Sequence, residues 1–214
     1  MEPRLLQEIA SKSITKRDLL QRVKKDFSLL STVLDGVSSP KAAVRYGCAS
    51  VLMDLSQAYP EKLYPHMDSF IALLDSKYRI LTWNALAMIA NLARVDDNRK
   101  FDAIFTKYYS FLNDEYMITV ANVVGYSGKI ALAKPYLTQR IADELLKVRR
   151  ISTTPHLTEE CKRVIAEKAI ESFDVFFNQI DNRKKVVDFV KSQLNSPRKT
   201  LKIKAENFLR KRNQ

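Results

Sequence analysis

The sequence predicts an all-α fold, a superhelix of about five stacked helical hairpins. Glycine and proline together supply few of the 214 residues (4 and 7), which leaves little material for the tight turns of β-hairpins. Apolar residues recur along most of the chain at the three- and four-residue intervals of one helix face. This helical pattern repeats about every 37 residues, as expected when neighbouring hairpins share one continuous core.

The N-terminal part of the chain predicts a short helix followed by the first hairpin. Residues 3–10 carry a brief apolar pattern, which we expect to be an extra helix that caps this hairpin. Residues 17–37 form one amphipathic helical stretch with apolar residues at Leu19, Leu20, Val23, Phe27, Leu30 and Val33. The second helix of the hairpin follows from Val44, because Cys48, Val51 and Leu52 fall on the same face.

Residues 64–92 contain the clearest hairpin. Its first helix has one apolar stripe, formed by Met67, Phe70, Ile71 and Leu74. Pro65 suits the first helical turn, where a backbone N–H has no helical partner to lose. Asp75 and Ser76 interrupt the pattern and are expected to cap a second helix, since their side chains accept hydrogen bonds from backbone N–H groups. The stripe of that second helix comprises Leu81, Ala85, Met88, Ile89 and Leu92.

The third copy, which begins at Thr119 after a first-helix stretch at 99–112, is the most degenerate. Gly125 and Gly128 each lower helix stability by up to about 1 kcal/mol relative to alanine. Its opening nevertheless keeps the register of the second copy, because N-D-E-Y-M-I-T-V-A-N at 113–122 aligns with D-S-K-Y-R-I-L-T-W-N at 75–84.

The last two copies begin at Ile165 and Leu201, after first-helix stretches at 134–148 and 183–194. A wider spacing before the fourth copy requires an insertion, which we place near residues 149–158 as an exposed loop or a helix interruption. We expect residues 1–214 to be a single repeat domain that ends in a basic capping repeat at 183–214.

Two motifs carry a resemblance to a known family. The run P-x-M-x-x-F-I-x-x-L-D at 65–75, followed by L-x-x-x-A-x-x-M-I-x-x-L at 81–92, resembles a HEAT repeat. The segment V-R-x-x-C-x-x-V-L-x-x-L at 44–55 includes the Val-Arg pair typical of that family's second helix. The resemblance spans residues 17–212 and implies an armadillo-type α-solenoid, a fold that carries no chemistry of its own.

The net charge of +12 is concentrated at the C-terminus. Residues 183–214 contain eleven lysines and arginines but only two acidic residues, whereas the rest of the chain is nearly balanced. The two cysteines, Cys48 and Cys161, lie inside helical patterns without metal-ligand spacing, and we expect buried thiols in a reducing compartment. No apolar run approaches the ~20 residues that span a bilayer, so we expect a soluble cytoplasmic protein that does not insert into membranes.

The sequence favours a non-enzymatic scaffold that binds a protein partner on the concave face of the superhelix. Tyr78, Trp83 and Asn84 lie at the start of a second helix, and Trp83 is off the apolar stripe. Packing against the adjacent repeat is the favoured explanation of the tryptophan, and the alternative is an aromatic anchor for a binding partner. His66 and His156 have no catalytic partner at helical spacing, so we expect no enzyme activity, no cofactor and no metal. We also expect a monomer.

The alternative is a nucleic-acid-binding solenoid. Phosphates or an acidic partner could be contacted by basic residues near the helix turns and in the C-terminal segment, namely Arg45, Lys77, Arg79, Lys199, Lys202, Lys204, Arg210, Lys211 and Arg212. For the C-terminal residues, a solubilising polar cap on the last repeat is the favoured explanation. The chain resembles HEAT-like DNA-alkylation-repair glycosylases in size, repeats and charge, but it has one tryptophan and no acid within a turn of it.

Overall fold

A computed structural model describes residues 3–212, and its regular secondary structure there is helical. The only β interaction among these residues is an isolated bridge between Thr154 and Leu157. The chain divides into two compact units, unit 1 (residues 1–96) and unit 2 (residues 97–214). Each unit consists of helical hairpins, which confirms the predicted all-α repeat fold.

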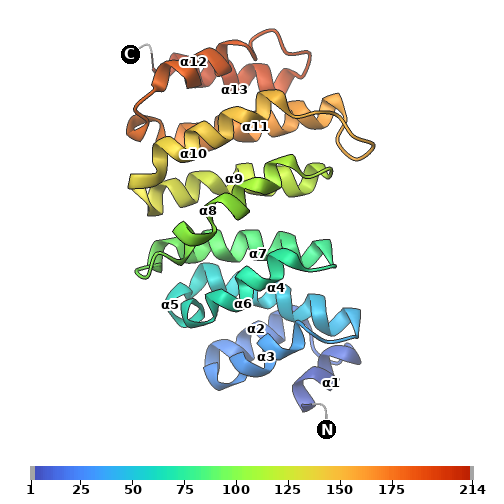
Figure 1. Ribbon diagram of the computed structural model, residues 1–214. Helices are drawn as coiled ribbons and strands as arrows, with labels where there is room; N and C mark the ends of the chain where they lie inside the picture. Colours follow the sequence, from blue (N-terminus) through green and yellow to red (C-terminus); the bar gives the residue numbers. More distant parts are fainter. Residues whose placement is uncertain (1–2, 213–214) are drawn as a thin grey trace. The chain divides into compact units, whose positions relative to one another are not determined.

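Unit 1 contains seven α-helices within the described residues (Figure 1). They are α1 (Arg4–Ala10), α2 (Lys16–Lys25), α3 (Leu30–Gly36), α4 (Ala42–Ala58), α5 (Pro60–Leu63), α6 (Met67–Ala72) and α7 (Arg79–Leu92). The second helices α4 and α7 pack against each other, and α1 packs on α3 and α4 as the predicted extra helix.

The stretch 17–37 forms two helices, whereas the sequence pattern predicted one. The chain leaves the helical conformation at Asp26, whose backbone is extended (φ −140°, ψ 96°). The Asp26 carboxylate accepts a hydrogen bond from the Ser28 backbone N–H at 2.9 Å, which starts a 3-10 turn that leads into α3. The apolar spacing alone did not reveal this break, because the hydrophobic stripe continues through it.

The turns before the second helices share one hydrogen-bond pattern, in which a side chain accepts the backbone N–H two residues further on. The predicted cap of α7 is wrong in this respect. Ser76 does not cap the helix directly; its hydroxyl accepts the backbone N–H of Tyr78, the N-cap residue, at 3.1 Å. Equivalent bonds run from Lys41 to Ser39, from Tyr116 to Asp114 and from Arg198 to Ser196. Side chains of this kind fix a turn by binding the backbone two residues on.

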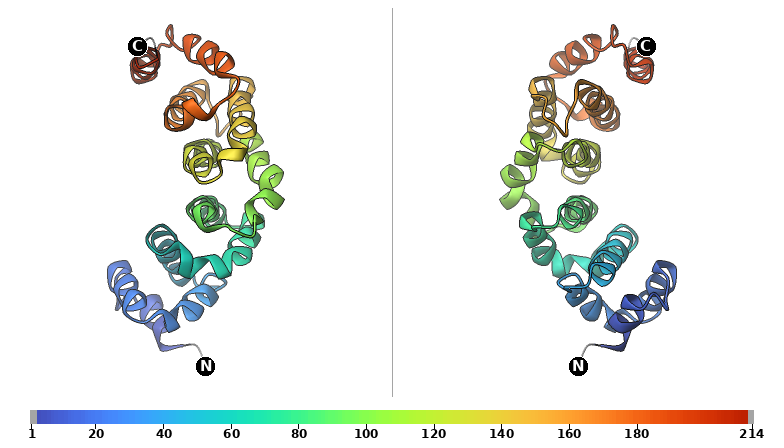
Figure 2. Two further views of the ribbon diagram at one scale, coloured as in Figure 1. Left: turned by 90° about the vertical axis from the view of Figure 1, so that its left-hand side faces the viewer. Right: turned by 90° about the vertical axis from the view of Figure 1, so that its right-hand side faces the viewer.

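Unit 2 contains six α-helices within the described residues. They are α8 (Lys100–Ser110), α9 (Met117–Ala133), α10 (Thr138–Leu145), α11 (Glu159–Phe176), α12 (Arg183–Lys191) and α13 (Lys199–Arg210). Within this unit, α9, α11 and α13 form one row and α8, α10 and α12 form another (Figure 2). Helix α11 packs against both α9 and α13, so it is the central helix of the unit.

One of the two glycines that weaken the helix propensity of the third copy, Gly128, has a packing role at the contact between α9 and α11. A Cβ atom at Gly128 would lie 3.4 Å from the Cα of Ser172, so the two backbones approach closely there. The Ser172 hydroxyl crosses the same contact and donates to the Val124 carbonyl at 2.5 Å. Loss of helix propensity at Gly128 is therefore offset by close helix packing.

The segment between α10 and α11 is irregular. It includes a 3-10 helix (Leu146–Arg150) and then the non-helical residues 151–158. The Thr154 hydroxyl donates to the Glu115 carbonyl at 2.6 Å, and the His156 ring stacks on Tyr116 with ring centroids 4.2 Å apart. These contacts hold the segment against the start of α9.

The two cysteines differ in environment. Cys48 is fully buried in α4, as predicted, but Cys161 is only half-buried near the start of α11. Cys161 lies one turn after the N-cap residue Thr158, at a helix end that packing leaves accessible. None of the helices in residues 3–212 combines the length and the apolar character needed to cross a bilayer.

Candidate functional site

The residues predicted for partner binding lie in the first part of α7. Tyr78 is the N-cap residue, and Trp83 and Asn84 are both half-buried on the helix. Ile80 precedes Asn84 by one helical turn, so the two share a face. Ile80 is an exposed large apolar side chain, with 41% of its surface accessible. The start of α7 therefore presents apolar and amide groups side by side.

Helix α9 repeats this arrangement in the same register. Ile118 corresponds to Ile80 and is 49% exposed, and Asn122 corresponds to Asn84 and is likewise half-buried. Ile80, Ile118 and Asn122 were missing from the residues predicted from sequence. The alignment of 75–84 with 113–122 contained the information, but an isoleucine in an apolar stretch gives no sign of exposure until the helix is placed.

Arg45, predicted as a possible contact for phosphates or an acidic partner, is mostly buried at the start of α4 and not exposed. Only 5% of the residue is accessible. Its Nη1 donates to the carbonyls of Ser39 (2.8 Å) and Pro40 (3.2 Å), and its guanidinium lies 3.7 Å from the centre of the Tyr78 ring. Lys77 and Arg79, its neighbours in the predicted set, are exposed at the turn before α7 and at its first residue.

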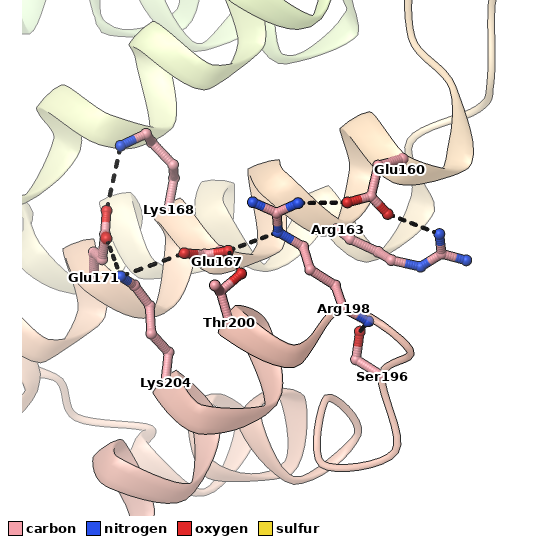
Figure 3. A network of polar contacts seen from close by, with 9 residues as sticks. All are labelled: Glu160, Arg163, Glu167, Lys168, Glu171, Ser196, Arg198, Thr200 and Lys204. Carbon is pink, nitrogen blue, oxygen red and sulfur yellow. Dashed lines mark hydrogen bonds and ion pairs between the residues drawn. The ribbon is translucent and has the colours of Figure 1, made fainter.

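Several predicted C-terminal cations are paired with acids of α11 instead of lying on an open polar face. Lys204 contacts Glu167 (3.4 Å) and Glu171 (2.5 Å) (Figure 3). Arg198, which was not among the predicted residues, binds both Glu160 and Glu167. The Asp174 carboxylate forms ion pairs with Lys211 Nζ at 2.6 Å and with Arg212 Nη2 at 2.5 Å. The basic C-terminal segment therefore neutralises a row of acids across the contact between α11 and α13.

The sequence spacing of these acids indicates a row on one helix face, but the row was missing from the predicted site residues. Its members are Glu160, Glu167, Glu171 and Asp174. Their separations of seven, four and three residues place them on one helix face.

The ion pairs shift the titration of these carboxyls. Burial alone would raise the pKa of Glu167, but hydrogen bonds from Arg198, Thr200 and Lys204 outweigh it and hold that pKa below the ordinary value. Glu171 and Asp174 behave in the same way, since burial opposes but does not cancel the effect of their bases. The hydrogen bond to Glu171 in turn raises the pKa of Lys204.

Three predicted cations of α13 remain on the outside. Lys199 and Lys202 are exposed, and Lys202 lies 4.0 Å from Glu206 on the same helix. Arg210 is exposed and donates to the Asn207 side chain at 2.9 Å. An exposed pair such as Lys202 and Glu206 contributes little to stability.

The described residues contain no group of three or more His, Cys, Asp or Glu side chains placed to hold a metal ion. His66 ends a 3-10 helix (Tyr64–His66), and His156 is stacked on Tyr116. The two histidines lie in different units, each in a local structural setting.

Comparison with known proteins bears on the fold. No family model and no curated protein matches the sequence. A designed armadillo repeat protein is similar over 97% of this chain and 90% of its own, with 18% identity and a TM-score of 0.60. A second, in complex with the peptide (KR)4, has 14% identity, the same coverage and a TM-score of 0.65. An engineered protein gives 15% identity, coverages of 97% and 87%, and a TM-score of 0.55. The chain thus has an armadillo/HEAT-like helical solenoid fold.

Proposed function

We propose that this chain is a non-enzymatic, monomeric scaffold that binds a peptide segment of a protein partner through the second helices of its repeats. The carrying observation is the recurrence of an exposed isoleucine followed one turn later by a half-buried asparagine, at Ile80 and Asn84 in unit 1 and at Ile118 and Asn122 in unit 2.

The chemistry of these pairs suits a peptide backbone. An asparagine amide both donates and accepts hydrogen bonds, so it can satisfy the N–H and C=O groups of one peptide unit. An adjacent exposed isoleucine offers apolar contact to a side chain of the ligand. Trp83, next to Asn84, adds an aromatic group of the type favoured at binding hot spots.

Two further facts support the proposal. One of the structurally similar designed proteins is described in complex with a peptide. That peptide is basic, whereas the turn before α7 in this chain exposes the cation Lys77. Electrostatic complementarity therefore favours an acidic peptide as the partner of this chain.

A peptide-display selection on the immobilised full chain tests the proposal. We expect selected peptides to bind with dissociation constants of about 1 to 100 μM, typical of a modest interface. Asn84→Ala and Asn122→Ala should each weaken binding about five- to tenfold, because a hydrogen-bonded peptide group loses its partner. Titration by fluorescence anisotropy measures the change.

Ile203→Ser is the matched control, since Ile203 is also an exposed isoleucine but lies on α13 out of register with Ile80 and Ile118. The asparagine one turn after it, Asn207, is exposed and accepts a hydrogen bond from Arg210 instead of being half-buried. It should leave affinity unchanged, whereas Ile80→Ser and Ile118→Ser should lower it. Failure of every selected peptide to bind saturably, or equal losses in all three serine variants, would show the proposal to be wrong.

A further inference from the structure

A hollow of about 450 Å³ lies in unit 1 between two of the turns that precede second helices. One wall is the turn from α3 to α4, and the other is the turn from α6 to α7. Its polar lining comprises Ser38, Ser39, Arg45, Ser76, Lys77 and Tyr78. Two cations and several hydroxyls thus face one hollow, and no acidic residue lines it.

The buried guanidinium of Arg45 is the unusual feature of this hollow. Charged side chains are rarely buried without an ionic partner, because removal from water is costly unless a counter-charge offsets it. Within residues 3–212, Arg45 makes no ion pair: its only hydrogen bonds are the two that Nη1 donates to carbonyls. Its buried Nε–H has no hydrogen-bond partner.

Arg45 is held in place without an anion. Two carbonyls fix Nη1, and the guanidinium lies against the rings of Tyr78 and Tyr46, at 3.7 and 4.8 Å from their centres. Stacking on aromatic faces suits the planar guanidinium. Because the side chain is already ordered, an anion that reached it would be bound with little further loss of conformational entropy.

The remaining groups of the hollow complement an oxyanion. Lys77 is exposed, lies 5.2 Å from the centre of the Tyr78 ring and makes no ion pair within the described chain. The hydroxyl oxygens of Ser39 and Ser76 accept backbone N–H groups, which leaves their own hydrogens to be donated. Two cations and two hydroxyl donors form the set expected around a carboxylate or phosphate.

We propose that this hollow is an anion subsite that takes one acidic group, a carboxylate or a phosphoryl ester, from a peptide partner. That the anion belongs to a peptide rests on the proposed function. That the hollow binds an anion does not, because it is inferred from Arg45 and the residues around it. Tyr78 joins the two, since it is both a wall of the hollow and the N-cap residue of α7, the helix that carries Ile80, Trp83 and Asn84.

The subsite can be tested on the full chain by NMR of the arginine Nε–H groups. The probes are acetate and inorganic phosphate, each exchanged for chloride at constant ionic strength. We expect the one resonance that is absent from the Arg45→Met variant to shift saturably, with a dissociation constant of about 1 to 30 mM for a single small anion. No shift with either anion up to 100 mM would overturn the subsite.

A second variant keeps the test valid if Arg45→Met fails to fold. Lys77→Gln removes an exposed charge and should lower the affinity for the anion about threefold, because one of two cations near a partly screened anion is lost. Lys199→Gln makes the same chemical change at an exposed lysine on α13, in the other unit, and should have no effect. Equal affinity in wild type and Lys77→Gln would contradict the two-cation site.

The peptide source is tested separately with peptides from the display selection. We expect the selected peptides to share one glutamate that occupies the hollow. Replacing this glutamate by glutamine should lower the affinity at least fivefold for wild type and should leave the affinity for Arg45→Met unchanged. Phosphoserine at the same position should restore the affinity for wild type. If peptides bind but the glutamate does not matter, this inference fails and the proposed function stands. If acetate or phosphate binds but no peptide is selected, the subsite stands and the proposed function fails.

Discussion

Gly36 ends α3 at a point where the interior of unit 1 has no room for a side chain. A Cβ atom there would lie 2.4 Å from the Cys48 sulfur and 3.0 Å from a methyl carbon of Leu6. Three elements, α1, α3 and α4, therefore meet around one missing side chain. Steric fit, and not backbone freedom, requires glycine at this position, because its φ angle is not positive.

We expect Gly36→Ala to lower the free energy of unfolding by about 1 to 3 kcal/mol, the usual effect of overpacking a filled core. Gly36→Ala combined with Cys48→Ala should recover part of that loss, because the sulfur that blocks the new methyl group is removed. Urea denaturation of the full chain measures both changes.

Gly125→Ala is the control. Gly125 lies on α9, is exposed, and its nearest neighbour would be a flexible lysine carbon at 3.6 Å. This change should stabilise the protein by about 0.5 to 1 kcal/mol through helix propensity. A Gly36→Ala protein as stable as Gly125→Ala would contradict the packing account.

The thiols provide a second test at the scale of single residues. Burial raises the pKa of Cys48 to about 12, so its reactive thiolate form is scarce at neutral pH. We expect one thiol per native chain to react rapidly with Ellman's reagent at pH 8, and Cys161→Ser to abolish that fast phase. Two equally fast thiols would show that the interior around Cys48 opens readily.

At the scale of elements, the contact between α11 and α13 combines apolar packing with a row of ion pairs. Glu167 is the central acid, with 15% of its side chain accessible and three partners in Arg198, Thr200 and Lys204. Networks of this kind contribute more than isolated surface pairs. We expect Glu167→Gln to cost about 1 kcal/mol and to speed amide hydrogen exchange in α13.

The acidic row also predicts a pH dependence. The pKa values of Glu167 and Glu171 are lowered in the folded protein from an ordinary value of 4.5, and that of Asp174 from 3.8. Their stabilising contribution is therefore fully present above about pH 5 and is lost as the pH falls through the folded pKa values.

Thermal unfolding between pH 7 and pH 2 checks the sign. Wild type should lose stability faster than Glu167→Gln/Glu171→Gln/Asp174→Asn, and the difference between the two proteins should shrink towards zero in acid. A difference that stays constant down to pH 2 would mean that the three acids contribute nothing through their charge.

At the scale of the whole molecule, the net charge of +12 left two explanations open in the sequence, a solubilising polar cap and a patch that binds phosphates or an acidic partner. An open patch that neutralises about five phosphates would give a log-log salt slope of about −4 to −5 with duplex DNA. Because Arg198, Lys204, Lys211 and Arg212 are paired with acids, we expect a slope no steeper than about −2.

Fluorescence anisotropy with a labelled duplex at 50 to 200 mM salt measures this slope. Lys204→Gln should change the salt slope little, because Lys204 is paired with Glu167 and Glu171. It should instead lower the free energy of unfolding. A slope of −4 that becomes shallower in Lys204→Gln would favour the nucleic-acid alternative over a peptide-binding scaffold.

The sequence by itself determined the class of fold and the cores of the second helices. Val44, Leu81 and Leu201, the predicted first members of three stripes, are all buried. Such stripes are local: residues three, four, seven and eight apart share a helix face whatever the rest of the chain does. Local breaks were harder to predict, since the extended backbone at Asp26 lies within an unbroken hydrophobic pattern.

Only the tertiary structure decided which polar residues are available. Arg198 meets Glu160 across 38 positions of sequence, and Arg45 is enclosed by Tyr78 from the following repeat. The sequence alone does not distinguish an exposed cation from a cation that is paired with an acid. Their difference arises from contacts between successive repeats, which exist only once the helices are stacked.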